Sequence, residues 1–162
     1  MEYIYLGKIV NTHGIKGELR IISSFRYKEK VFVKNFSLYI GKKYEKEIIN
    51  SYRPHKNYDM ITLKGYENIN EVLKYKGLPV FIKREDLDLT ENEILDEDLI
   101  GLPVWINGEI KGYVEQVVPG NQDKLIVTNQ NNKYYIPYVK GIIQKIDKEK
   151  GIILENISGL IE

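Results

Sequence analysis

Residues 85–98 read EDLDLTENEILDED, and this acidic stretch decides how the chain is divided. It holds eight acidic residues and neither lysine nor arginine, contains no aromatic residue, and shows no helical or strand period. A segment of this composition is typical of a linker. We therefore expect it to join two folded pieces, residues 1–84 and residues 99–162, and a chain of 162 residues is long enough for two small domains.

Net charge is distributed unevenly about this linker. Residues 1–84 hold 17 Lys/Arg against 8 Asp/Glu, a net charge of +9, whereas residues 85–98 carry −8 and residues 99–162 hold seven of each sign. A basic half can accumulate near phosphates by counterion release, and an acidic segment suits a basic protein partner. The alternative, which composition leaves open, is that both are ordinary solvated surfaces.

The composition excludes several classes of protein. Cysteine is absent, which rules out disulfides and thiolate metal sites and fits a reducing compartment. The N-terminus lacks the features of a secretion signal, and no apolar run approaches the roughly 20 residues of a membrane-spanning helix. We expect a cytoplasmic protein that does not enter membranes.

Strand signals dominate the half before the linker, where one short helix is expected from about Ile69 to Lys76. Asn68 can cap that helix and Gly77 can end it. The β-rich runs are 3–10, 18–23, 37–40, 47–52, 60–63 and 80–83. Their number and spacing predict a small barrel.

The half after the linker shows the same pattern. Asn107-Gly108 is the strongest hairpin turn in the chain, since both residue types tolerate positive φ. Further strands are expected at 104–106, 113–118, 125–127, 134–136, 142–146 and 152–154. Because closure removes exposed strand edges, we predict an all-β fold of two small closed β-barrels joined by the acidic linker.

No motif for catalysis, nucleotides or metals is present. There are only two histidines, no G-x-S-x-G elbow and no phosphate-binding glycine loop. Residues 86–97 imitate the spacing of a calcium loop, but Glu91 stands where the turn needs glycine. We therefore predict no metal, no cofactor and no catalytic residue.

Two stretches are candidates for binding. Residues 7–20, GKIVNTHGIKGELR, break a predicted strand at Asn11 and resume it after Gly17, so His13, Lys16 and Arg20 could surround a phosphate-contacting loop. An ordinary hairpin loop is the alternative. In residues 93–104, EILDEDLIGLPV, the apolar residues either anchor the linker to the second barrel or form an exposed docking strip.

Both stretches resemble the RimM family of ribosome maturation factors. The HG-[IL]-x-G-E-[LV]-[RK] pattern of that family is matched at 13–20, and its DL-[IM]-G element at 98–101. Its G-x-x-D-x-L-x-V, I-P-[FY]-V and I-x-x-[IV]-D elements are matched at 120–127, 136–139 and 143–147. The matches occur in the family's order along the whole chain.

The resemblance implies an N-terminal barrel similar to those of translation factors and a C-terminal PRC barrel. It implies a monomeric, non-catalytic factor that binds ribosomal protein S19 and the head of the immature 30S subunit, assisting assembly and 16S rRNA processing. His13, Lys16 and Arg20 would contact RNA or the ribosome. The partner-binding positions would be Ile94, Leu95, Asp98 and Leu99, the first two matching a tyrosine pair of some relatives.

Two other classes remain open on the residues alone. An RNA-modifying or RNA-processing enzyme using the basic barrel would show a cleft with converging ionisable groups of shifted pKa. A small-molecule-binding barrel would enclose a cavity of several hundred Å³ instead of a packed core.

Overall fold

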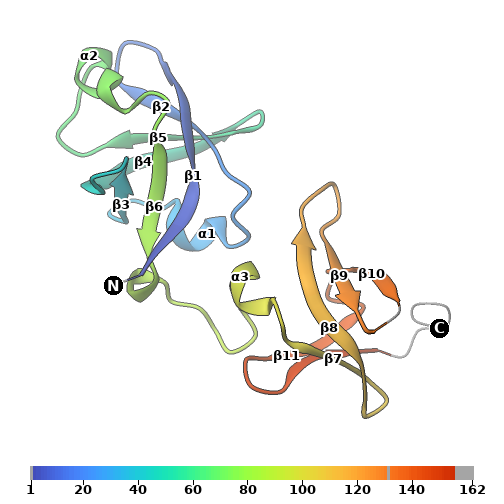
Figure 1. Cartoon of the computed structure of the whole chain (residues 1–162). Helices are drawn as coiled ribbons and strands as arrows, with labels where there is room; N and C mark the ends of the chain where they lie inside the picture. Colours follow the sequence, from blue (N-terminus) through green and yellow to red (C-terminus); the bar gives the residue numbers. More distant parts are fainter. Residues whose placement is uncertain (1, 131, 156–162) are drawn as a thin grey trace. The chain divides into compact units, whose positions relative to one another are not determined.

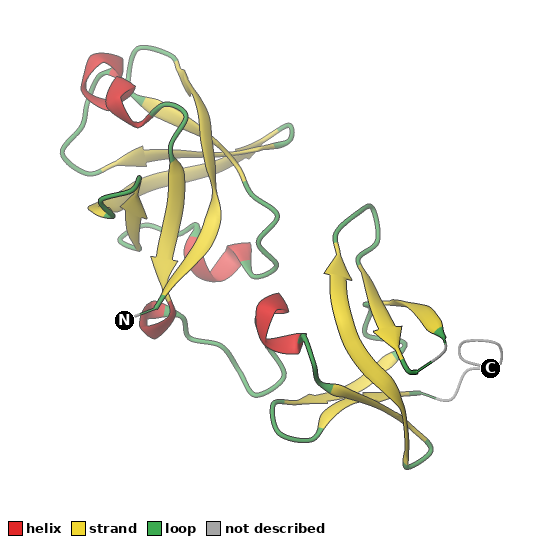
Figure 2. Ribbon diagram, viewed as in Figure 1, coloured by secondary structure: helices red, strands yellow, loops and turns green. Residues whose placement is uncertain are grey.

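The computed structural model describes residues 2–130 and 132–155. The chain forms two compact units, Met1–Asp88 and Leu89–Glu162, and the division falls inside the acidic segment. Strands are the main regular structure of both units, and the helices are short (Figure 2). The predicted all-β class is confirmed. Within the described ranges, no helix has the length and apolar character needed to cross a membrane.

Six antiparallel strands close the first unit into a barrel with the order β1-β2-β5-β4-β3-β6 (Figure 1). The strands are β1 (Tyr3–His13), β2 (Glu18–Ile22), β3 (Ser37–Ile40), β4 (Glu45–His55), β5 (Tyr58–Leu63) and β6 (Pro79–Lys83). All six predicted strands are found. Their alternating apolar residues fill the interior, including Ile9, Leu19 and Ile61, each fully buried. The interior of this barrel is therefore a packed core.

The predicted helix is present but short, and it is not alone. It consists of α2 (Ile69–Val72) and the 3-10 turn η1 (Leu73–Tyr75), and Asn68 and Glu71 form a capping box at its start. The unit also holds α1 (Lys28–Val31) and η2 (Arg84–Asp86), so the expectation of a single helix is wrong. A helix of four residues gives too little periodicity for sequence patterns to detect.

One buried carboxylate ties α1 to the barrel. Asp59 of β5 is 3% exposed; one of its oxygens accepts a hydrogen bond from the Tyr52 hydroxyl at 2.8 Å, and the other pairs with the ammonium of Lys28 at 2.8 Å. Burial and this hydrogen bond raise the pKa of Tyr52 to about 12. The only charged side chain buried among the described residues is therefore paired.

The second unit is a six-stranded sheet with the order β10-β9-β8-β7-β12-β11. Its strands are β7 (Pro103–Ile106), β8 (Glu109–Val118), β9 (Lys124–Thr128), β10 (Lys133–Pro137), β11 (Ile143–Asp147) and β12 (Gly151–Leu154). Asn107 and Gly108 have φ of 52° and 79°, which confirms the predicted hairpin turn. Among the described residues β10 and β11 are not paired, so the closed ladder expected here is found only in the first unit.

The acidic segment is partly folded into the second unit. α3 (Asp96–Leu99) begins within it and ends one residue beyond it, and Ile94 and Leu99 belong to the same hydrophobic cluster as Val127 and Ile152. Ile94, Leu95 and Leu99 are at most 2% exposed. Of the two possibilities for these apolar residues, anchoring to the following sheet is therefore the one that the structure supports.

Candidate functional site

The tight loop between β1 and β2 is formed by residues 14–17. β1 continues to His13 and β2 begins at Glu18, with a register shift between Ile9 and Asn11. The predicted break at Asn11 is therefore a bulge, and the reversal comes three residues later. Gly14 and Gly17 have φ of 70° and 82°, a conformation that favours glycine and that allows so short a connection.

Contacts with the start of α2 hold this loop in place. The backbone N–H of Ile69 donates to the carbonyl of Ile15 at 3.0 Å. Gly17 is buried against Asn68, and a Cβ there would lie 3.0 Å from the Asn68 carbonyl oxygen. The loop tip consequently projects Ile15, 79% exposed, and Lys16 into solvent from a fixed backbone.

Arg20 lies beside the loop in a partly buried position. Its guanidinium donates to Nδ1 of His13 at 2.7 Å and lies over the ring of Tyr58, 5.4 Å from the centroid. Nε of Arg20 is buried without a hydrogen-bond partner among the described residues. Because an arginine cannot lose its proton, His13 must present an unprotonated Nδ1 to it. Arg20 therefore orients His13 and supplies positive potential.

A second arginine, Arg53, was not predicted from the sequence and pairs with Glu18, the first residue of β2. Arg53 of β4 donates two hydrogen bonds of 2.8 Å to the carboxylate of Glu18. These bonds lower the pKa of Glu18, with further contributions from the charge of Arg53 and from His13 and His55. The loop, Glu18, Arg53 and Thr62 enclose a shallow hollow of about 390 Å³.

Replacing Arg53 with methionine is expected to raise the pKa of Glu18 toward its ordinary value. The lowered pKa means that the pair stabilises the folded state above pH 4.5 and that this contribution is lost as the pH falls through the folded-state value. Carbon-13 NMR titration of the Glu18 carboxyl measures the change. An unchanged Glu18 titration in the variant would exclude Arg53 as the main cause.

The four predicted partner-binding residues are not presented together. Ile94, Leu95 and Leu99 are buried, and Asp98 is half-buried in α3. The apolar side chain of this stretch that does reach solvent is Ile100, 48% exposed. Of the four predicted residues only Asp98 reaches the surface, and the buried three hold this stretch against the sheet.

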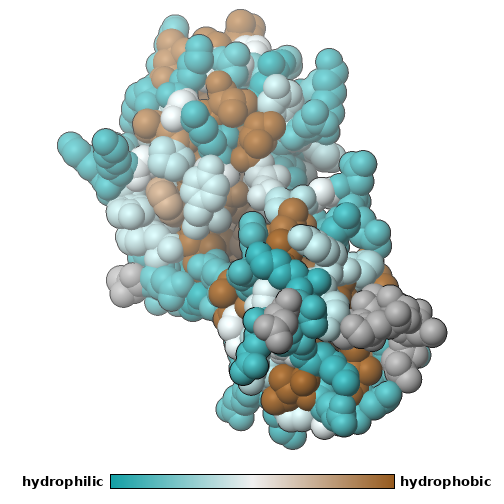
Figure 3. All heavy atoms as spheres, turned by 45° about the vertical axis from the view of Figure 1, so that its right-hand side comes forward, coloured by the Kyte–Doolittle hydropathy of each residue, from teal (hydrophilic) through white to brown (hydrophobic). Residues whose placement is uncertain are grey.

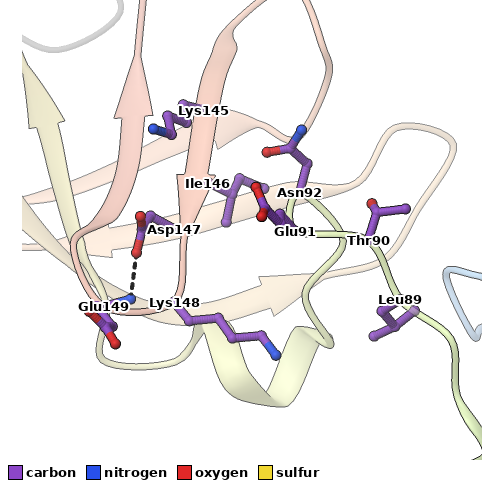
Figure 4. Close-up of a pocket in the computed structure, with 9 residues that line it drawn as sticks. All are labelled: Leu89, Thr90, Glu91, Asn92, Lys145, Ile146, Asp147, Lys148 and Glu149. Carbon is purple, nitrogen blue, oxygen red and sulfur yellow. Dashed lines mark hydrogen bonds between the residues drawn. The ribbon is translucent and has the colours of Figure 1, made fainter.

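The second unit contains an open hollow of about 500 Å³ between residues 89–92 and the β11–β12 turn (Figure 4). Asp147 accepts hydrogen bonds from the backbone N–H groups of Glu149 and Lys150, and these bonds lower its pKa. The carboxylate of Asp147 therefore stabilises the β11–β12 turn. Figure 4 shows the side chains of Lys145, Lys148 and Glu149 pointing in different directions, so they do not converge on one point.

No group of three or more His, Cys, Asp or Glu within residues 2–130 and 132–155 is arranged to hold a metal ion. On the face shown in Figure 3, hydrophobic residues lie in small groups separated by hydrophilic ones. Such a mixed surface is typical of globular proteins.

Comparison with known proteins gives a consistent family assignment. The family model for the RimM N-terminal domain matches residues 4–87. The chain is 35% identical to the ribosome maturation factor RimM of Exiguobacterium sp. strain AT1b over 170 residues, covering 100% of this chain and 98% of that protein. Proteins of the same name are 38% identical in Ligilactobacillus salivarius (99% of both chains) and 35% identical in Bacillus subtilis (99% and 98%).

Among solved structures, the chain is similar to a putative 16S ribosomal RNA processing protein RimM from Pseudomonas aeruginosa. The identity is 18%, the TM-score is 0.45, and the likeness covers 97% of this chain and 99% of that one.

Proposed function

Since the chain belongs to the RimM family of ribosome maturation factors, we propose that it binds the immature 30S ribosomal subunit and assists its assembly without catalysing a reaction. The observation that carries this proposal is the identity of about 35% to proteins of that name over both units and nearly the full length of each chain. The name of those relatives describes a role in ribosome maturation. The likeness extends over the acidic segment as well as both sheets.

The first unit is proposed to face RNA. Residues 1–84 carry a net charge of +9, and the loop at 14–17 projects Lys16 from a backbone that α2 holds fixed. Lysine side chains of this kind are attracted to the phosphate groups of RNA, and their contacts with phosphates fix the orientation of the protein on the RNA. Arg20 adds positive potential beside the loop and holds His13 through the hydrogen bond to its Nδ1. Lys16 is thus the proposed phosphate contact, and Arg20 and His13 support it.

The acidic segment is proposed to face ribosomal protein S19. Glu85, Asp86, Asp88 and Glu91 are exposed, while the apolar residues of the same segment fix its second half to the sheet. A basic ribosomal protein would be attracted by this density of carboxylates and repelled by the basic first unit. The partner contact would thus include Asp98 and Ile100 at the anchored end.

Binding of the full-length chain to purified immature and mature 30S subunits, and to S19 alone, tests the proposal. We expect binding to immature subunits and to S19. A chain that recognises neither immature subunits nor S19 is not acting as this proposal states. A catalytic role would instead appear as a change in the RNA of the subunits that continues at substoichiometric protein.

Replacing Lys16 with glutamate is expected to weaken binding to immature subunits by about tenfold. It is also expected to reduce the slope of log affinity against log salt concentration by about one. The reason is that an exposed phosphate contact is lost and a repulsive charge takes its place. Titration of labelled protein at several salt concentrations measures both effects. Lys124→Glu is the control, because it makes the same charge change at an exposed position of the second unit; equal weakening by both variants would rule out a specific role for the loop.

A further inference from the structure

A row of aromatic side chains crosses the outer face of the first barrel. The antiparallel register places Tyr5 of β1 opposite Phe81 of β6, and Phe81 opposite Tyr39 of β3. Residues directly opposite one another share a face of the sheet. Ile4 and Ile82, next to this row, are buried in the core, so the row points outward.

Two further aromatic rings extend this row. Tyr3, two residues before Tyr5 on the same face, stacks on Tyr44 with centroids 3.9 Å apart and planes at 6°. Tyr44 also meets Phe81 edge to face at 5.1 Å, and Tyr5 meets Phe81 in the same way at 5.9 Å. Tyr3, Tyr5, Tyr39, Tyr44 and Phe81 are called the aromatic platform below. These stacking and edge-to-face contacts hold the rings in fixed orientations.

Much of the aromatic platform is open to solvent. Tyr5 is 57% exposed and Tyr44 is 38% exposed, although the barrel core beneath them is complete without either ring. Cross-strand aromatic pairs stabilise a sheet, and that accounts for Tyr39, which is 5% exposed. It does not account for the outward faces of Tyr5 and Tyr44, which are available to another flat group.

Cations surround the platform. The ammonium of Lys83 lies 4.7 Å from the ring centroid of Tyr39 and 5.9 Å from that of Tyr3. Lys46, which is exposed, is the register partner of Tyr39 and continues the row onto β4. Lys42 and Lys43 are exposed in the turn beside Tyr44. Glu85 also lies here, with its carboxylate 3.9 Å from the ammonium of Lys83. The surface thus combines exposed π faces with net positive charge.

We propose that the aromatic platform binds single-stranded RNA, with unpaired bases stacked on Tyr5 and Tyr44 and the flanking phosphates neutralised by the surrounding lysines. This inference rests on the proposed function, to which it adds the class of RNA and a second contact surface. Stacking on aromatic rings within a positively charged surface is the way proteins hold unpaired nucleotides without reading their sequence. A duplex cannot use the platform because its bases are already stacked on one another.

The test uses the full-length chain with a labelled oligouridine and with an RNA duplex of the same length. Tyr5→Ala is expected to weaken binding of oligouridine at least about fivefold, since one stacked base is lost. Tyr5→Phe keeps the ring and is expected to bind within about twofold of the unmodified chain. Tyr135→Ala, at a 63% exposed tyrosine of the second unit, is the matched control and is expected to change nothing.

The outcomes separate this inference from the proposed function. Equal affinities of Tyr5→Ala and the unmodified chain for oligouridine, or an equal loss with the duplex, would overturn the platform while leaving binding to immature subunits in place. Weaker binding of Tyr5→Ala to S19 with unchanged oligouridine affinity would overturn it in favour of a protein contact. Failure of the unmodified chain to bind immature subunits would instead contradict the proposed function.

Discussion

Replacing Ile94 with aspartate is expected to unfold the second unit while the first unit stays folded. Ile94 is fully buried in the hydrophobic cluster of the second unit. Removing a side chain of this size from a core costs about 2–5 kcal/mol, and an unpaired charge in the same place adds several more. The sum is comparable with the roughly 5–15 kcal/mol of a whole domain.

Trp105 gives a direct measurement of this effect. It is the only tryptophan in the chain, it lies on β7, and its indole N–H donates to the carbonyl of Lys150 at 2.7 Å. Its fluorescence during urea titration therefore reports the second unit alone. Hydrogen exchange of peptides from residues 2–88 reports the first unit, where protection is expected to be unchanged.

Ile100→Asp is the matched control, because Ile100 directly follows α3 but is 48% exposed. We expect it to leave the urea midpoint of Trp105 nearly unchanged. If Ile94→Asp also left that midpoint unchanged, the side chain would not be part of the core. Together the two variants separate a structural role for the acidic segment from a contact with a partner, since Ile100→Asp alone would weaken binding without unfolding.

Strand patterns made most of the fold predictable from sequence. The run from Ser37 to Ile40 matches β3 residue for residue, and the turn at Asn107-Gly108 lies where its chemistry requires positive φ. Asn68 caps α2 as its residue type suggested. These features depend on local preferences, which a single sequence displays directly.

The role of the acidic segment could not be predicted in the same way. Its charge density indicates a linker, yet Ile94, Leu95 and Leu99 anchor it to the second unit. Three apolar residues without a regular period do not show whether they meet a core or a partner. That distinction depends on tertiary packing, which overrides local composition.

The candidate site also combines features that the sequence shows locally with features that depend on tertiary structure. The glycines of the 14–17 loop were visible in the sequence, but the pairing of Glu18 with Arg53 joins residues far apart along the chain. The aromatic platform likewise depends on the register between β1, β6 and β3. Its one local signal is the alternation at the chain's start, where Ile4 and Leu6 point inward and therefore turn Tyr3 and Tyr5 outward.

Replacing Gly7 with valine is expected to destabilise the first unit by about 3 kcal/mol or more, the upper end of what overpacking costs. Gly7 lies where the β1–β6 register shifts and where β1 passes close to the end of β2. A Cβ at this position would collide with the carbonyl oxygen of Ile22 and approach Cβ of Ser23 to 3.0 Å. Backbone atoms cannot give way as the end of a flexible side chain can, so β1 itself would have to move.

Hydrogen exchange of residues 2–88 measures this loss, and the Trp105 urea transition is expected to stay in place. Gly141→Val is the control, because a Cβ at Gly141 meets nothing within 4 Å. Since β1 carries both the 14–17 loop at its end and Tyr5 of the platform, Gly7→Val should weaken subunit binding through both surfaces at once. Retained binding with a disrupted first unit would mean that recognition resides in the second unit alone.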